Sequence, residues 1–186
     1  MNTYLVLLRG INVGGKNKIP MSDLKTCLTD VGFSNVSTYI ASGNVLLTSD
    51  KSAQAVQQTI ERVLPKHFRL DSELIKVLVL TPAQLKTIID KRPKGFGDKP
   101  DAYYSDVIFL MDVPIDKAMP VFTPRQGVDT VWPGIGVVYS QRLSAQRTKS
   151  RLGAIVGTHT YKSMTIRSWS TTTKLLQLLE AMERDT

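Results

Sequence analysis

The chain has 186 residues, 42% of them apolar and 22% charged, which is typical of a globular protein and excludes a disordered chain or a coiled coil. Its formal net charge of +8 favours anionic partners. The single cysteine, the lack of a signal peptide and the lack of an apolar run near ~20 residues predict a cytoplasmic protein without disulfides or membrane contact.

The first half of the chain predicts alternating strands and helices. In chain order, we expect a strand at 3–9, a helix at 20–32, strands at 36–41 and 45–49 around the turn Ser42-Gly43-Asn44, a helix at 53–68, a strand at 73–80 and a helix at 81–90. Thr81 and Gln84 have the spacing of a capping box. Cys27 lies in the apolar stripe of the first helix, so we expect core packing rather than a reactive thiol.

The second half repeats this order. It predicts a strand at 105–111, a short helix at 114–122, a hairpin at 129–140 with the turn Pro133-Gly134-Ile135-Gly136, a helix at 144–157, a strand at 163–169 and a final helix at 170–182 capped by Ser170. Matching later elements are about 90 residues apart, which indicates a duplication. We therefore expect an α+β protein with two ferredoxin-like (βαββαβ) subdomains and additional helices, at residues 1–92 and 102–186, joined by a linker at about 92–101.

A glycine-rich, basic loop follows the first strand. In a ferredoxin-like unit the first and third strands are neighbours, so this loop, the first helix start and the first hairpin turn should share one rim. Backbone amides and positive side chains gathered there would suit an anion. The candidate ligand-binding residues are Arg9, Asn12, Gly14, Gly15, Lys16, Asn17, Ser42 and Asn44.

The glycine spacing of this loop fits neither a Walker loop nor a dinucleotide fingerprint. A purely structural loop, with its glycines at positive φ and its asparagines bonded to their own backbone, therefore remains an equal alternative.

Residues 130–179 contain no Asp or Glu. The predicted helix at 144–157 places Arg147 and Arg151 four residues apart with Lys149 between them, and together with Arg167 they form a candidate secondary basic patch. A solvated helix face is the alternative. Arg167 and Trp169 are two residues apart on the last predicted strand and should share one side of it. Trp169 would then either stack on a ligand or, like Trp132, anchor the core.

Other chemistry has little support in the sequence. His67 and His159 are the only histidines and lack metal-ligand spacing, so we expect neither a metal site nor a cofactor. Asp23 is the only carboxylate predicted near the glycine loop, and complementing the helix dipole accounts for it. The aliphatic strands at 3–9 and 105–111 disfavour RNA binding on a sheet face.

The segments LLRGINVGGKNKIPMSDLK and GFSNVSTYIASGNV resemble the N-terminal signature of the bacterial domain-of-unknown-function family 1697. TIRSWSTTTKLLQLL resembles its C-terminal arginine–tryptophan motif. The resemblance spans nearly the whole chain and implies two ferredoxin-like subdomains but no activity. The family motif reads Arg-Asn-Trp-Asn-Thr, whereas this chain has serine at Ser168 and Ser170, so a role for those asparagines does not carry over.

Three functions remain open. The first is binding of nucleic acid or a phosphorylated small molecule at the glycine-rich loop, with the acid-free window as further positive surface. The second is an enzyme for a small phosphorylated or carboxylated metabolite, with Arg9, Asn12 and Lys16 holding the anion. The sequence offers no general base for such a reaction near this loop. The third is an interaction or assembly protein, whose oligomeric state the sequence leaves open.

Overall fold

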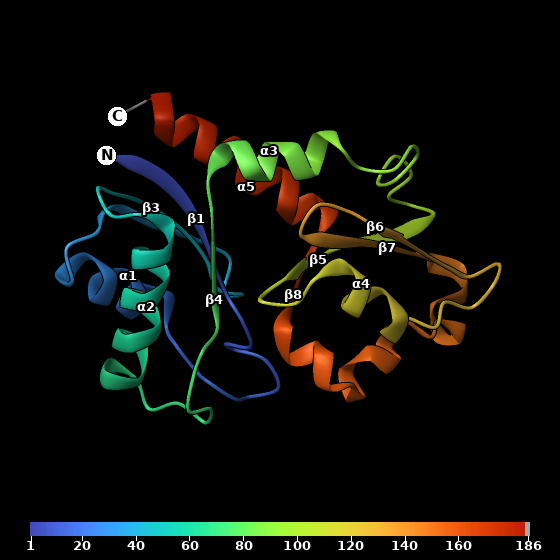
Figure 1. Ribbon diagram of the computed structural model, residues 1–186, viewed down its shortest axis with the longest axis horizontal. Helices are drawn as coiled ribbons and strands as arrows, with labels where there is room; N and C mark the ends of the chain where they lie inside the picture. The colour runs from blue at the N-terminus through green and yellow to red at the C-terminus, as the bar shows by residue number, and fades with distance from the viewer. Residues whose placement is uncertain (185–186) are drawn as a thin grey trace. The chain divides into compact units, whose positions relative to one another are not determined.

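The computed structural model describes residues 1–184 and has the predicted α+β architecture. Its main elements, shown in Figure 1, are β1 (Asn2–Leu8), α1 (Met21–Asp30), β2 (Ser34–Tyr39), β3 (Asn44–Ser49), α2 (Ala53–His67), β4 (Val77–Leu80), α3 (Pro82–Asp90), β5 (Tyr103–Leu110), α4 (Ile115–Ala118), β6 (Asp129–Pro133), β7 (Val137–Leu143), β8 (Met164–Ser168) and α5 (Trp169–Arg184).

Two four-stranded antiparallel sheets have the same strand order. The first runs β2-β3-β1-β4 and the second β6-β7-β5-β8, so each has the ferredoxin-like arrangement in which the first strand of the unit lies between the third and the fourth. In the first sheet Val6 pairs with Val45 and Val79, which fixes the register at its centre. The expected duplication of fold is therefore confirmed.

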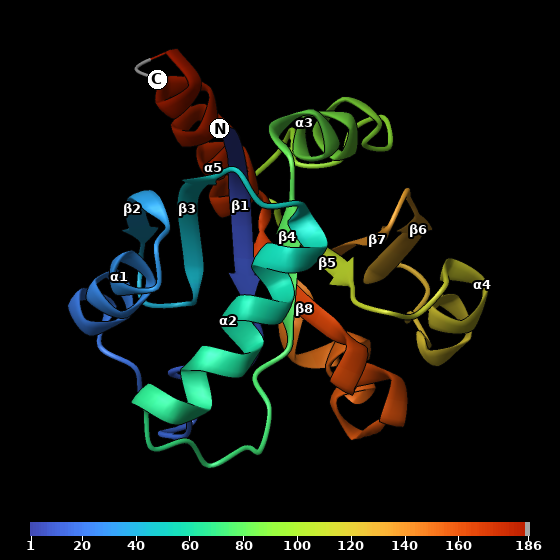
Figure 2. The same ribbon diagram turned by 60° about the vertical axis from the view of Figure 1, so that its left-hand side comes forward.

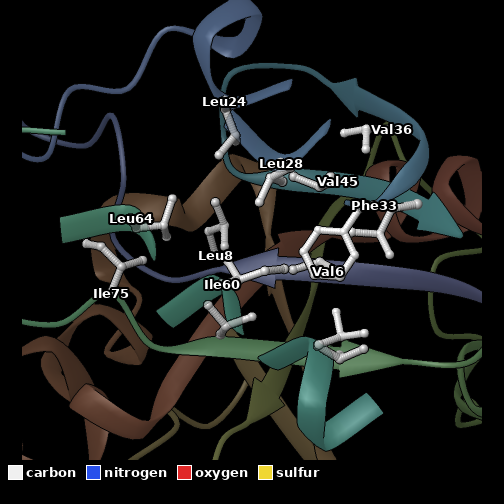
Figure 3. Close-up of a cluster of buried hydrophobic side chains, with 14 of the residues drawn as sticks. Val6, Leu8, Leu24, Leu28, Phe33, Val36, Val45, Ile60, Leu64 and Ile75 are labelled. Atoms are coloured by element: carbon white, nitrogen blue, oxygen red, sulfur yellow. The ribbon is translucent and has the colours of Figure 1, made fainter. Parts of the chain in front are cut away.

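The first sheet is covered by α1 and α2 on one face (Figure 2). Figure 3 shows the core between them: Val6 and Leu8 of β1 meet Leu24 and Leu28 of α1 and Ile60 of α2. These helix residues recur every three or four positions, which places them on one side of each helix. The other face of β1 is also buried, because every residue from Thr3 to Leu8 is shielded from solvent.

The second sheet packs Ile108, Val138 and Met164 against Ala118 and Leu152. Its helices are much shorter than those of the first unit, because the segment after β7 forms no α-helix. Residues 144–163 form three 3₁₀ segments instead, Ser144–Lys149, Leu152–Gly157 and His159–Ser163. The predicted helix at 144–157 is therefore wrong.

The reason for this break lies in competing hydrogen bonds. Asp129 Oδ2 accepts from the backbone N–H of Arg151 at 2.8 Å, and Ser150 Oγ accepts from that of Leu152 at 3.2 Å, so neither amide is left for an α-helical bond. Gln146 has φ −123° and Ser150 has ψ 142°, both outside helical values. Local side-chain acceptors have replaced the helical ladder here.

The last strand and helix meet one residue earlier than predicted. β8 ends at Ser168 and α5 begins at Trp169, with Ser168 Oγ accepting from the N–H of Thr171 at 3.2 Å. Ser168 is thus the capping residue rather than Ser170. The Thr81–Gln84 capping box is confirmed, with reciprocal bonds of 2.8 and 3.2 Å.

Two compact units divide the chain differently from the expected boundary. Of the described residues, one unit comprises Met1–Leu85 together with residues 175–184, and the other comprises Lys86–Lys174. The division therefore falls within α3 and α5, not at residues 92–101.

Candidate functional site

The glycine-rich loop contains a tight turn at its tip. The N–H of Lys16 donates to the carbonyl oxygen of Val13 at 3.0 Å, and Gly14 and Gly15 between them have φ +58° and +76°. Two successive residues with positive φ require glycine in practice, which explains the pair. Both are exposed, and among residues 1–184 no acceptor bonds their amides.

Asn12 holds the base of the loop. Its Nδ2 donates to the carbonyl oxygens of Ile19 and Ala41, each at 2.9 Å, and its Oδ1 accepts from the N–H of Ile19 at 2.8 Å. Ala41 lies in the first hairpin turn, so the expected meeting of the two corners is confirmed. Gly43 adds a close approach, since a Cβ there would come within 2.9 Å of Leu8 Cβ.

Asn17 ties in a third segment that the sequence did not indicate. Its side chain is buried, with Nδ2 donating to the Gly10 carbonyl and to Ser72 Oγ, each at 3.0 Å, and Oδ1 accepting from the N–H groups of Asp71 and Ser72 at 2.9 and 3.0 Å. The N–H of Asn17 donates to Asp71 Oδ2 at 2.6 Å. We call residues 9–20, 40–43 and 68–76 together the glycine-loop rim.

Asn44 also serves the fold. It is fully buried, and its Nδ2 donates to the Tyr39 carbonyl at 3.0 Å and to Ser42 Oγ at 2.9 Å. Asn12, Asn17 and Asn44 therefore bond chain atoms, as the structural alternative predicts. Lys16 and Lys18 are exposed and Arg9 is half-buried, so the positive residues proposed for ligand contact remain at the surface.

The start of α1 adds to this rim. Pro20 precedes the helix and provides no side-chain cap, which leaves the first-turn amides without that acceptor. Asp23 lies in the first turn, where its charge complements the helix dipole. The rim segments themselves contain two further carboxylates, Asp71 and Glu73, which no sequence pattern assigned to this site.

Apolar side chains are exposed on all three segments of the rim. Val13, Ile40 and Leu74 are 65%, 52% and 49% exposed. Ile40 also has φ +50°, which is unfavourable for a β-branched residue. The rim thus combines an apolar part with a basic one.

The secondary basic patch does not form as predicted. Arg147, Lys149 and Arg151 are exposed, but the broken 3₁₀ path removes the shared α-helical face. Arg167 is buried, its Nη1 donates to Thr165 Oγ1 and the Ile166 carbonyl, each at 2.8 Å, and burial lowers the pKa of its guanidinium to about 10. It therefore belongs to the interior of the second unit and not to a surface patch.

The aromatic side chains of the second unit form their own cluster. Phe96 packs edge-on against Trp132, Tyr139 and Trp169, with ring centroids 6.0, 5.2 and 5.3 Å apart. Trp169 also has the guanidinium of Arg92 over its ring at 5.5 Å. Because Trp169 begins α5, strand alternation does not relate it to Arg167.

Metal and thiol chemistry find no further support over the described chain. Within residues 1–184, no three His, Cys, Asp or Glu side chains are grouped as a metal site. Burial, with a smaller contribution from Asp30, raises the pKa of the Cys27 thiol. In the same residues, no helix has both the length and the apolar character needed to cross a membrane.

Comparisons with known proteins agree with this architecture. The conserved bacterial protein SP0830 from Streptococcus pneumoniae is 25% identical and superposes with a TM-score of 0.81, over 96% of this chain and 98% of its own. No relative was found among curated proteins. The family model described as protein of unknown function (DUF1697) matches residues 1–139, which include the whole first sheet, the glycine-loop rim and strands β5 and β6 of the second sheet. The chain therefore belongs to the DUF1697 family.

Proposed function

We propose that the glycine-loop rim binds a phosphate-bearing anion, either nucleic acid or a phosphorylated small molecule. One observation carries this proposal: the exposed Gly14–Gly15 tip has unbonded amides and lies next to the exposed cations Lys16 and Lys18. Backbone amides without side chains around them allow phosphate oxygens to approach closely.

The network beneath the tip supports the same proposal. Asn12 and Asn17 fix the loop through bonds to three chain segments, so little conformational entropy remains to be lost when a ligand binds. The three segments of the rim have five cationic residues against two acidic ones, and Asp23 of α1 is a third acidic residue beside them, so the excess of positive charge still favours approach of an anion. The carboxylate of Asp71 accepts a hydrogen bond from the N–H of Asn17, and its negative charge would repel an anion at that position. We therefore place the anion at the Gly14–Gly15 tip and not at Asn17.

Fluorescence anisotropy with labelled single-stranded and duplex oligonucleotides tests this function, and competition by nucleoside triphosphates and inorganic phosphate distinguishes the two sources of phosphate. The Lys16→Gln/Lys18→Gln double variant should weaken binding at least about tenfold and lower the salt dependence by about two counterions. Lys66→Gln, at an exposed position in α2, is the matched control. Unchanged binding by the double variant would remove the rim as the site.

Protein binding is a second candidate function, favoured by the exposed Val13, Ile40 and Leu74. Apolar anchors beside lysines suit an acidic segment of a partner that carries apolar side chains. A Val13→Ser/Leu74→Ser variant would abolish such binding while leaving phosphate binding intact. Light scattering at several protein concentrations would report whether the partner is a second copy of this chain.

A further inference from the structure

A separate cavity of about 190 Å³ lies within the second unit, at the point where β8 gives way to α5. The last strand pair there joins Asp106 of β5 to Ser168 of β8, whereas β5 begins three residues earlier at Tyr103. The edge of β5 at residues 103–105 therefore has no β8 partner, and the cavity occupies this position. Tyr103, Tyr104, Ser105, Asp106 and Trp169 contribute to its lining.

Two polar side chains in the lining of this cavity, Ser105 and Asp106, make no side-chain hydrogen bond within residues 1–184. Ser105 Oγ in its lining is buried and makes no hydrogen bond. The carboxylate of Asp106 makes no hydrogen bond within residues 1–184, and Arg142 Nη2 lies 3.9 Å from its Oδ2. Arg142 Nε is also buried and unbonded. Buried polar atoms are nearly always satisfied, so the unpartnered Ser105 Oγ beside an unbonded carboxylate calls for a functional explanation.

A ligand that donates hydrogen bonds would stabilise the carboxylate of Asp106. Its side chain is 26% exposed, and burial raises the pKa of its carboxyl while Arg142 acts in the opposite direction. A carboxylate accepts two parallel N–H bonds side by side, and hydrogen bonds to a charged acceptor are about twice as strong as neutral ones. A ligand with two adjacent N–H donors would complete this group.

Aromatic rings and arginines define the rest of the ligand. Tyr104 and Trp169 contribute to the lining, and aromatic rings pack favourably against a planar group. Each already has a guanidinium over it, Arg142 at 5.6 Å from the Tyr104 ring and Arg92 at 5.5 Å from the Trp169 ring. Arg142 already faces the charge of Asp106, and Arg92 is paired with Asp98 at 3.4 Å, so neither a cation nor an anion would find an unpaired counter-charge here. This leaves a neutral planar ligand.

We propose that this cavity binds a neutral heteroaromatic ring whose edge carries two adjacent N–H donors, as the Watson–Crick edge of guanine does, with that edge on Asp106. The cavity has the liquid volume of about six water molecules, enough for one fused ring system. A sugar or phosphate attached to the ring would extend outside it. This site is independent of the phosphate-binding rim, which lies in the other unit.

Titration of the full chain with guanosine, inosine and adenosine tests the proposal through the fluorescence of Trp169. A Trp132→Phe background removes the other tryptophan, so that the signal reports this cavity. Guanosine should bind about tenfold or more tightly than inosine, which lacks the 2-amino group, and adenosine should bind weakest because it offers one donor beside an acceptor. Free guanosine has no phosphate, and Lys16→Gln/Lys18→Gln should leave its binding unchanged.

The Asp106→Asn variant then tests whether the Asp106 carboxylate accepts the hydrogen bonds of the ligand. It should lose at least about tenfold in guanosine affinity, whereas Asp116→Asn, at an exposed position in α4, should lose none. Thermal unfolding of both variants verifies that they fold. If Asp106→Asn does not fold, the comparison of guanosine with inosine on the parent protein tests the proposal instead.

Equal affinity for guanosine and inosine, unchanged guanosine binding by folded Asp106→Asn, or no saturable binding up to about 1 mM would overturn the assignment. Guanine nucleotides that bind like guanosine would place the phosphate in solvent, and tighter binding by them would identify the nucleotide as the source of the ring.

Discussion

The side-chain amide of Asn12 donates a hydrogen bond to the carbonyl oxygen of Ala41 at 2.9 Å and so joins the glycine loop to the first hairpin turn. The two residues are 29 positions apart, and the bond forms because β1 and β3 are antiparallel neighbours. Asn12 itself has φ +54°, which asparagine tolerates better than most residues. Asn12 therefore shares with Asn17 the fixing of the loop that carries the exposed lysines.

Replacing Asn12 should destabilise the fold. Asn12→Gly keeps the positive φ accessible but loses three side-chain bonds, and we expect a cost of about 2 kcal/mol in the free energy of unfolding. Asn12→Ala adds the strain of a Cβ at φ +54° and should cost about 1 kcal/mol more. Urea unfolding measures both. Equal midpoints for the variants and the parent would show that the bridge contributes nothing to stability.

Ile40 should be replaceable with a gain in stability. Its φ of +50° is unfavourable for a β-branched side chain that is also 52% exposed, so little packing offsets the strain. We expect Ile40→Asn to raise the free energy of unfolding by about 1 kcal/mol, as measured by thermal or urea unfolding. Ile135, an exposed residue in the second hairpin turn without positive φ, is the matched control, and Ile135→Asn should change stability little.

Asp129 should contribute stability that is lost in acid. Burial raises the pKa of its carboxyl, but hydrogen bonds from Ser150 and from the N–H groups of Arg125 and Arg151 outweigh burial and leave the pKa below its ordinary value of 3.8. The contribution is therefore fully present above pH 3.8 and disappears as the pH falls through the lower, folded-state pKa.

At neutral pH, Asp129→Asn should cost about 1–2 kcal/mol, because a neutral acceptor replaces a charged one. The difference from the parent should narrow in acid. A constant difference in the free energy of unfolding from neutral to acidic pH would contradict the assigned pKa direction.

Asp106 should behave in the opposite way. Burial raises the pKa of its carboxyl despite the opposing effect of Arg142, so ionisation disfavours the folded state. The destabilisation is absent below the unfolded pKa near 3.8 and grows as the pH rises through the folded value. Asp106→Asn should therefore unfold at a higher temperature than the parent at pH about 7, with the gain shrinking toward pH about 4. A lower unfolding temperature across this range would refute the prediction.

Ser168 and Ser170 should differ in their contribution to stability, because Ser168 caps α5 and Ser170 does not. Ser168→Ala removes the acceptor for the Thr171 N–H and should cost about 1 kcal/mol. Ser170 is exposed in the first turn, and Ser170→Ala should change the free energy of unfolding by less than about 0.5 kcal/mol. The pair of urea titrations distinguishes the observed cap from the one that the sequence suggested, since a larger loss at Ser170 would reverse the assignment.

The spacing of apolar residues predicted most of the helices and strands, because these elements depend on residues close together in the sequence. The apolar spacing of Leu24 and Leu28 and the capping pair of Thr81 and Gln84 give the same elements in the sequence and in the structure. The 3₁₀ path through residues 144–163 could not be predicted in this way. It depends on Asp129, 22 positions before the Arg151 amide that it captures, and no local pattern contains such a partner.

The amino-acid sequence alone determined the order of the strands and of the helices outside residues 144–157, the duplication, and the basic, glycine-rich character of the loop after β1, because these follow from residue type and spacing. Only the tertiary structure decided which polar groups serve the fold and which face solvent. It engaged Asn12, Asn17 and Asn44, brought Asp71 to the rim, buried Arg167 and left Ser105 and Asp106 beside a cavity. The physical reason is that a hydrogen bond depends on distance in space, which strand pairing sets, whereas the sequence records only separation along the chain.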